Sequence, residues 1–133
     1  MPHVQRYERI VPAISFTHID TSPMNLLPNL DQNSIQVPIQ VYVLPKIVTP
    51  FIGSPTVTLQ LGAIQVSSVS GLIAALNANK AFNLLLPERN LRIDGLDIAA
   101  VTGADLTMSS SSPITGGDGL IKIVMAYQIV YPL

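Results

Sequence analysis

The stretch SIQVPIQVYVLP, residues 34–45, alternates apolar and polar side chains with a period of two. The odd positions form one apolar face: Ile35, Val37, Ile39, Val41 and Val43. Such alternation predicts a β-strand that buries one face. Pro38 has no amide hydrogen to donate. We therefore predict either that this strand lies at a sheet edge or that the proline occupies a position where no donor is needed.

The same period recurs in TVTLQLG, residues 56–62, and above all in the closing run from 119 to 131. In that run Ile121, Ile123, Met125, Tyr127, Ile129 and Tyr131 share one face. β-branched and aromatic residues fill it, which favours a strand over a helix. The glycine cluster GGDG at 116–119 opens this strand. A phosphate-binding loop has to open a helix instead, so we interpret the cluster as a turn.

The remaining segments have weaker patterns. Prolines and a glycine interrupt residues 44–55, which we interpret as a loop or a broken strand. Residues 70–82 are compatible with one to three helical turns or with none, and residues 90–98 with a short strand. Many short strands and few helical signals predict an all-β fold, an antiparallel β-sandwich or barrel with at most one short helix.

The chain length of 133 residues suits one domain with a real core. We expect residues 34–133 to form a single β-sandwich domain. Residues 1–33 are rich in proline and asparagine without a sustained period, and we expect an N-terminal arm or irregular leader there. Whether it wraps the domain, reaches a neighbour or forms an ordinary surface loop stays open. No apolar run reaches the roughly 18 residues of a membrane span, so we expect no membrane partner.

Charge is scarce, because only 11% of residues are charged, against roughly 25% in ordinary soluble domains. The seven Lys and Arg are scattered and the net charge is −1, which argues against a nucleic-acid partner. Hydrophobic residues make up 48% of the chain. A small domain cannot bury so much apolar material alone, so we expect part of it to contact another chain. Alternatively, uncharged polar residues replace charge on a free surface.

Motifs for catalysis or metal binding are weak. Asp20-Thr21-Ser22 lacks the glycine and the second aspartate of an aspartic protease. His3, His18 and Asp20 lack a spaced fourth metal ligand. Both histidines lie in the N-terminal 33 residues, and no nucleophile elbow is present. We therefore expect no enzymatic activity, no metal and no cofactor.

Four segments together give the chain a family resemblance. They are SIQVPIQVYVLP at 34–45, TVTLQLG at 56–62, NLLLP at 83–87 and LTMSSSSPITGGDGLIKIVMAYQIV at 106–130. In this order they resemble the small cement, decoration or head-stabilising proteins of tailed bacteriophage virions. The resemblance covers roughly residues 34–131. It implies a jelly-roll-like β-sandwich, often trimeric, on the outside of the capsid. There it ties major capsid subunits together and has no catalytic residues.

The resemblance places the protein in the virion, and in the host cytoplasm during assembly. It gives two partners, further copies of the chain and the major capsid protein. A different function remains open, a phage tail, fibre or adhesin module that binds a receptor or glycan. The absence of Trp and an aromatic content of 5% count against it. Our candidate interface residues are Tyr42, Phe51, Pro38 and Tyr131, and the three aromatic ones are equally plausible as core residues. Tyr127 is a further candidate, although its place on the inward face favours the core.

Overall fold

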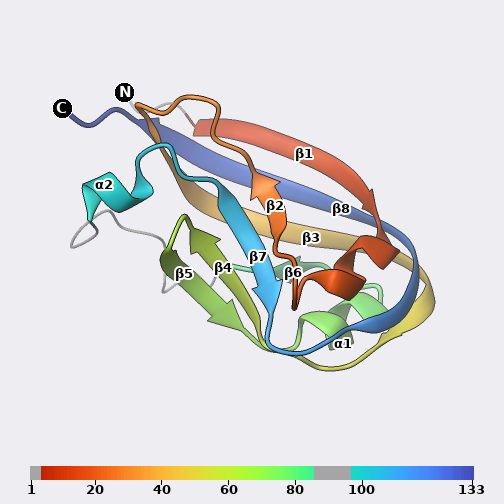
Figure 1. Ribbon diagram of the computed structural model, residues 1–133. Coiled ribbons are helices and arrows are strands. Elements are labelled where there is room, and N and C mark those ends of the chain that lie inside the picture. Colours follow the sequence, from red (N-terminus) through yellow and green to blue (C-terminus); the bar gives the residue numbers. More distant parts are fainter. Residues whose placement is uncertain (1–3, 86–96) are drawn as a thin grey trace.

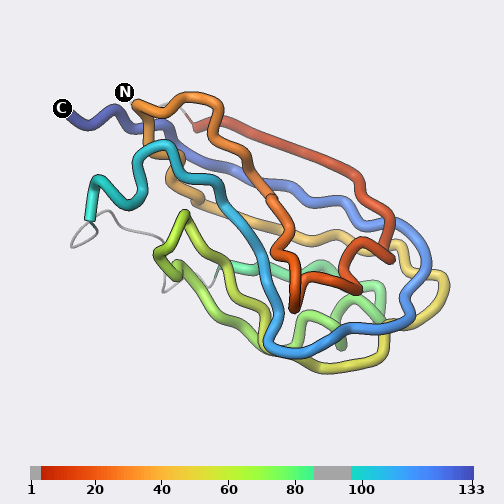
Figure 2. Tube along the Cα trace, in the orientation of Figure 1, coloured from red at the N-terminus to blue at the C-terminus, as the bar shows by residue number. Residues whose placement is uncertain are grey.

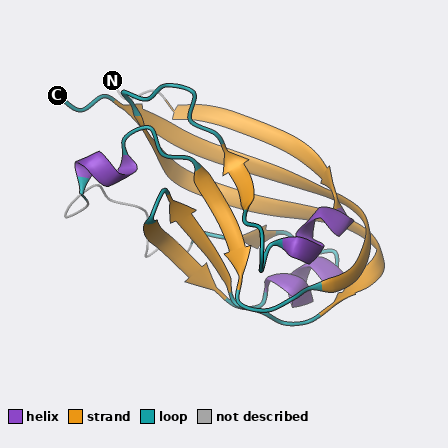
Figure 3. Cartoon of the chain, viewed as in Figure 1, coloured by secondary structure: helices purple, strands orange, loops and turns teal. Residues whose placement is uncertain are grey.

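A computed structural model describes residues 4–85 and 97–133. Strands form two packed layers, with short helical segments at the ends of the sandwich (Figure 1, Figure 3). The elements in chain order are β1 (Val4–Pro12), the 3-10 helix η1 (Ala13–His18), β2 (Met24–Leu27), β3 (Ile35–Ile52), β4 (Val57–Leu61), β5 (Ile64–Val69), α1 (Leu72–Asn77), β6 (Phe82–Asn83), α2 (Ile98–Val101), β7 (Leu106–Ser110) and β8 (Thr115–Val130).

The strand order shows an antiparallel sandwich with jelly-roll wiring. One sheet has the order β1-β8-β3-β6 and the other β2-β7-β4-β5. The first strand pairs with the last, the second with the seventh, the third with the sixth and the fourth with the fifth. The chain therefore folds as one long hairpin that rolls up and brings β3 beside β8 and β4 beside β7. This confirms the predicted fold class.

A single apolar core lies between the layers. Its largest fully buried side chains come from both sheets and from the segments between them: Phe16, Ile19, Leu26, Ile35, Leu59, Leu61, Leu72, Leu76, Leu84, Leu85, Leu106 and Met108. In β8 the inward positions Ile121, Ile123 and Met125 are buried, as the alternation predicts. Four of the five predicted inward residues of residues 34–45 are buried as well. Ile39 is only half-buried, because a β-bulge leaves it without a partner on β8 between Pro38 and Gln40.

The strand β3 continues to Ile52, so the expected loop or broken strand over 44–55 is wrong for most of that stretch. The edge of β3 away from β8 is paired with β6 at only two residues. Beyond these two residues, the side-chain amides of Asn77 and Asn79 bind the β3 backbone where a partner strand would otherwise lie. Asn79 Oδ1 accepts from the Ile47 amide at 2.7 Å, and Asn77 Oδ1 accepts from the Phe51 amide at 2.8 Å. Prolines are tolerated in β3 because this edge needs few ladder hydrogen bonds.

Residues 4–27 belong to the sandwich, which corrects the expectation of a separate arm or irregular leader over 1–33. The strand β1 pairs along its whole length with β8, from Val4 opposite Gln128 to Pro12 opposite Leu120. The strand β2 pairs with β7. The pairing supplies backbone partners that the irregular sequence pattern of this segment does not reveal. Figure 2 shows the start of β1 and the end of β8 at the same end of the molecule.

The helical content exceeds the expected single short helix. The ambiguous stretch 70–82 does form a helix, α1, whose Leu72, Ile73 and Leu76 are buried. The segments η1 and α2 are also helical. Most of the expected strand at 90–98 lies outside the described residues, and its last residue, Ile98, begins α2. The Asp97 side chain caps that helix by accepting from the Ala99 amide at 3.1 Å.

Candidate functional site

The outer side of strands β1, β8 and β3 presents several exposed apolar side chains. Side chains directly opposite each other across antiparallel strands share a face. Lys122 therefore lies between Ile10 and Leu44, in the row next to Leu120. We name the apolar residues of these rows the apolar face: Ile10, Tyr42, Leu44, Leu120 and Val124. Ile10 is 65% exposed, Leu120 50% and Leu44 38%.

The charges in the middle of this surface neutralise each other. Lys122 Nζ lies 3.2 Å from Glu8 Oε2, and both side chains are partly exposed. It is the only ion pair within residues 4–85 and 97–133. An exposed pair of this kind contributes little to stability. The pair leaves the centre of the apolar face without net charge, whereas two exposed cations lie at its margins on the same side of the sheet, Arg6 opposite Ala126 and Lys46 opposite Leu120.

The structure separates the four candidate interface residues. Tyr42 lies half-buried on the apolar face. Phe51 is 3% exposed and stacks on Phe16 with ring centroids 6.2 Å apart, so its assignment to an interface is wrong and it belongs to the core. Pro38 is buried beside the bulge of β3 and is not available to a partner either. Tyr131 is exposed just beyond the end of β8.

Sequence reasoning missed Ile10 and the rest of β1. Residues 4–12 do alternate, with Tyr7, Arg9 and Val11 on one side. The alternation is hard to recognise because a charged residue, Arg9, occupies one of the inward positions. Its Nη1 donates to the Asn25 carbonyl at 2.7 Å and so joins β1 to the neighbouring edge of the other sheet.

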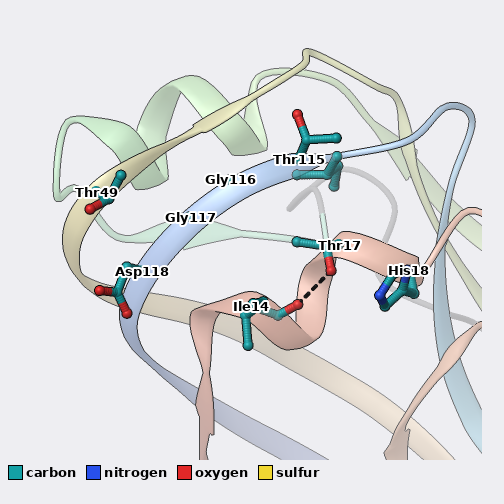
Figure 4. Close-up of a pocket in the computed structure, with 9 residues that line it drawn as sticks. Ile14, Thr17, His18, Thr49, Thr115, Gly116, Gly117 and Asp118 are labelled. Carbon is teal, nitrogen blue, oxygen red and sulfur yellow. Dashed lines mark hydrogen bonds between the residues drawn. The ribbon is translucent and has the colours of Figure 1, made fainter.

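A shallow depression of about 470 Å³ lies between η1 and the start of β8 (Figure 4). Ile14, Thr17 and His18 line it on one side, and the stretch Thr115–Asp118 lines it on the other. Two of its polar side chains are engaged within the chain. The Thr17 hydroxyl donates to the Ile14 carbonyl at 2.8 Å, and the Asp118 carboxylate accepts from the Gly119 amide at 2.8 Å.

This depression has no arrangement for acid–base or metal chemistry among the residues described. His18 forms no ion pair with Asp118, so the imidazole lacks an orienting carboxylate. No group of three metal-ligating side chains occurs in the described part of the chain. Of the metal candidates from the sequence, His3 lies outside the described residues. The depression therefore gives no argument for a reaction.

A second opening lies between the two sheets, where β1 and β8 approach the β2–β3 connection. Its volume is about 340 Å³. We name it the tyrosine cleft, and it is lined by Tyr7, Leu27, Pro28, Leu30, Asp31, Ser34, Gln36, Tyr127, Ile129 and Tyr131. Tyr7 and Tyr127 are half-buried, and both pack against the core. The hydrogen bond that Tyr131 makes to Asp31, together with the carboxylate charge, raises the pKa of Tyr131.

The chain matches no family model, no curated protein and no solved structure in the comparisons made. The fold assignment therefore rests on the strand order alone. In the described ranges no helix has the length and apolar character to cross a membrane.

Proposed function

We propose that this protein is a non-enzymatic virion structural protein, a cement or decoration protein that binds the outside of a phage capsid as an oligomer. The observation that supports it best is the apolar face, a broad sheet surface with exposed Ile10 and Leu120 and an internally neutralised ion pair. The jelly-roll wiring is compatible with this function, because the fold recurs in capsid proteins. A fold by itself does not specify a function.

The low charge of the chain favours self-association through this face. Exposed apolar area of this kind promotes aggregation unless a specific partner covers it. Closed cyclic assembly covers such a surface and limits growth. A trimer is the assembly that the family resemblance implies. Major capsid subunits would then contact the surface that the oligomer leaves free.

Self-association is tested by sedimentation equilibrium at about 10 μM, with the full chain. We expect an oligomer, and we expect Ile10→Lys to convert it to monomers, because burying an unpaired ammonium at an interface costs several kcal/mol. Ile10 is exposed in the single chain, so the substitution leaves the fold intact. The matched control is Ile98→Lys, which adds the same charge on α2 at a residue 41% exposed.

The oligomer of the control variant should be as stable as that of the wild type. A wild-type chain that sediments as a monomer would refute assembly through the apolar face. Equal dissociation by Ile10→Lys and Ile98→Lys would show instead that added charge alone is responsible.

Location on the capsid is tested separately. Antibodies against the purified protein should label the heads of tailed virions in immuno-electron microscopy, and a major capsid gene should lie next to its own. Labelling confined to tails or fibres would favour the alternative, a receptor-binding module.

A further inference from the structure

The tyrosine cleft concentrates the aromatic side chains of an aromatic-poor chain. The sequence contains four tyrosines, and Tyr7, Tyr127 and Tyr131 all line this opening. They come from β1, from β8 and from the segment after β8. Tyr131 is 66% exposed, so core packing does not account for its place. Three tyrosines around one opening offer a ligand aromatic faces as well as hydroxyl groups.

Within the described residues, the cleft contains one acceptor without a donor, Gln36 Oε1, and one carboxylate without a cationic partner, Asp31. Gln36 Oε1 is buried, and it has no hydrogen-bond donor among the residues that the structure describes. Asp31 pairs with no Lys or Arg in that part of the chain. None of the lining residues is cationic. A buried acceptor without a donor costs free energy, so a ligand that brings donors to this point is favoured.

The β2–β3 connection that carries Asp31 is tied to its surroundings by hydrogen bonds. Buried Asn29 donates from Nδ2 to the Ser34 carbonyl at 3.0 Å, and its Oδ1 accepts from the Asp31 amide at 2.9 Å. The Asn29 amide in turn donates to Asp105 Oδ1 at 2.7 Å. The Asp31 carboxylate itself accepts from the Asn33 amide at 3.0 Å, which fixes its position on the connection. A preorganised connection reduces the entropy that binding has to overcome.

The charge of the cleft decides the class of ligand. A carboxylate without a cation beside three tyrosines repels phosphate or carboxylate groups. The π-face of tyrosine attracts a cation at close range, and a carboxylate strengthens that attraction through a charge-assisted hydrogen bond. A neutral sugar can also supply donors, but it leaves the charge of Asp31 uncompensated.

We propose that the tyrosine cleft binds the cationic end of one lysine or arginine side chain presented by a partner protein. The ammonium or guanidinium group contacts Asp31 and the tyrosine rings, and one of its hydrogens reaches Gln36 Oε1. The volume of about 340 Å³ suits one side chain rather than a longer peptide. Only the identity of the partner as a capsid subunit rests on the proposed function, because the cation site is independent of it.

The site is tested by amide chemical shifts of the isotope-labelled full chain during titration. The probes are Nα-acetyl-lysine methylamide and Nα-acetyl-arginine methylamide, and the uncharged control is Nα-acetyl-norleucine methylamide. We expect saturable shifts around Asp31, Gln36 and Tyr131 with at least one cationic probe, with a Kd of about 1–10 mM. The two arms show which of the cations the cleft prefers.

Variants assign the effect to the cleft. Asp31→Asn should weaken binding at least about fivefold, since it removes the charge and keeps the shape. Tyr131→Ala should also weaken it, and this exposed residue can be replaced without disturbing the core. Asp20→Asn is the matched control, a carboxylate removed outside the cleft, and its Kd should equal that of the wild type.

Three results would overturn the proposal. They are the absence of saturable shifts up to about 50 mM probe, about five times the upper end of the expected Kd, equal shifts with the norleucine probe, and unchanged binding by Asp31→Asn. Saturable binding of a monosaccharide from a panel, without binding of the cations, would also overturn it and would favour the receptor-binding alternative. None of these outcomes depends on whether the protein decorates a capsid.

Discussion

Asn29 is the residue on which the β2–β3 connection depends. Its buried side chain satisfies the Ser34 carbonyl and the Asp31 amide at once. Asn29→Ala leaves the half-buried Asp31 amide without its partner and removes one of two donors from the Ser34 carbonyl, which keeps the Gly103 amide at 2.8 Å. We therefore expect a loss of about 1–3 kcal/mol in the free energy of unfolding, measured in urea. Asn33→Ala is the control, because its exposed side chain contributes no hydrogen bond to this turn; it should change stability by less than about 0.5 kcal/mol. Equal losses of stability in Asn29→Ala and Asn33→Ala would show that the Asn29 side chain does not stabilise the connection.

The pKa of Tyr131 should depend on the neighbouring Asp31 carboxylate. The hydrogen bond to Asp31 and its negative charge disfavour the phenolate, so the pKa of Tyr131 lies above its ordinary value of 10.0. The folded state thus holds this proton more tightly than the unfolded state. The resulting stabilisation is complete below pH 10.0 and is lost as the pH rises through the raised pKa of Tyr131.

Absorbance at 295 nm measures this shift, with Tyr131→Phe identifying the step that belongs to Tyr131. Asp31→Asn should lower the pKa of Tyr131 toward its ordinary value. An unchanged titration midpoint in Asp31→Asn would show that the carboxylate does not act on this hydroxyl.

At the scale of elements, the entry of β8 depends on glycine. Gly119 has φ of +123°, and a Cβ there would collide with the Lys46 carbonyl and lie 3.0 Å from the Ile47 Cα. Both contacts are backbone, so neither can yield cheaply. Gly119→Ala should cost about 3 kcal/mol or more in unfolding free energy. Gly71→Ala is the matched control, with φ of +88° and only the Phe82 ring at 3.9 Å, and should cost about 1 kcal/mol.

The two edges of β3 show why an element can escape prediction. Its pairing with β8 follows from alternating residues on both strands, which the sequence displays. Its continuation past Pro45 depends on Asn77 and Asn79, which lie more than 25 residues away. No local pattern in 44–55 signals that these side chains will supply the missing hydrogen bonds. The strand therefore looks broken until the chain is folded.

At the scale of the molecule, β1 is part of the cooperative unit. A chain that begins at residue 13 would leave the β8 edge unpaired and expose the core beside Val11. We expect it to unfold at a temperature at least about 5 °C lower than the full chain, or to aggregate, in a calorimetric scan. Removal of Pro132 and Leu133 is the control, because these residues lie beyond the last strand. An unchanged unfolding temperature in the truncated chain would show that residues 1–12 are not part of the cooperative unit.

The sequence by itself determined the fold class and the inward face of β8, because burial of one sheet face imposes a period of two on nearby residues. Tertiary structure alone decided that residues 4–27 join both sheets and that Phe51 lies in the core. It also decided that Tyr7, Tyr127 and Tyr131 line one cleft. These outcomes depend on which distant strands become neighbours, and a side chain reaches the core or the surface only through that pairing. The apolar face shows both influences: alternation marks one side of β8, and only its place between β1 and β3 makes it a broad surface.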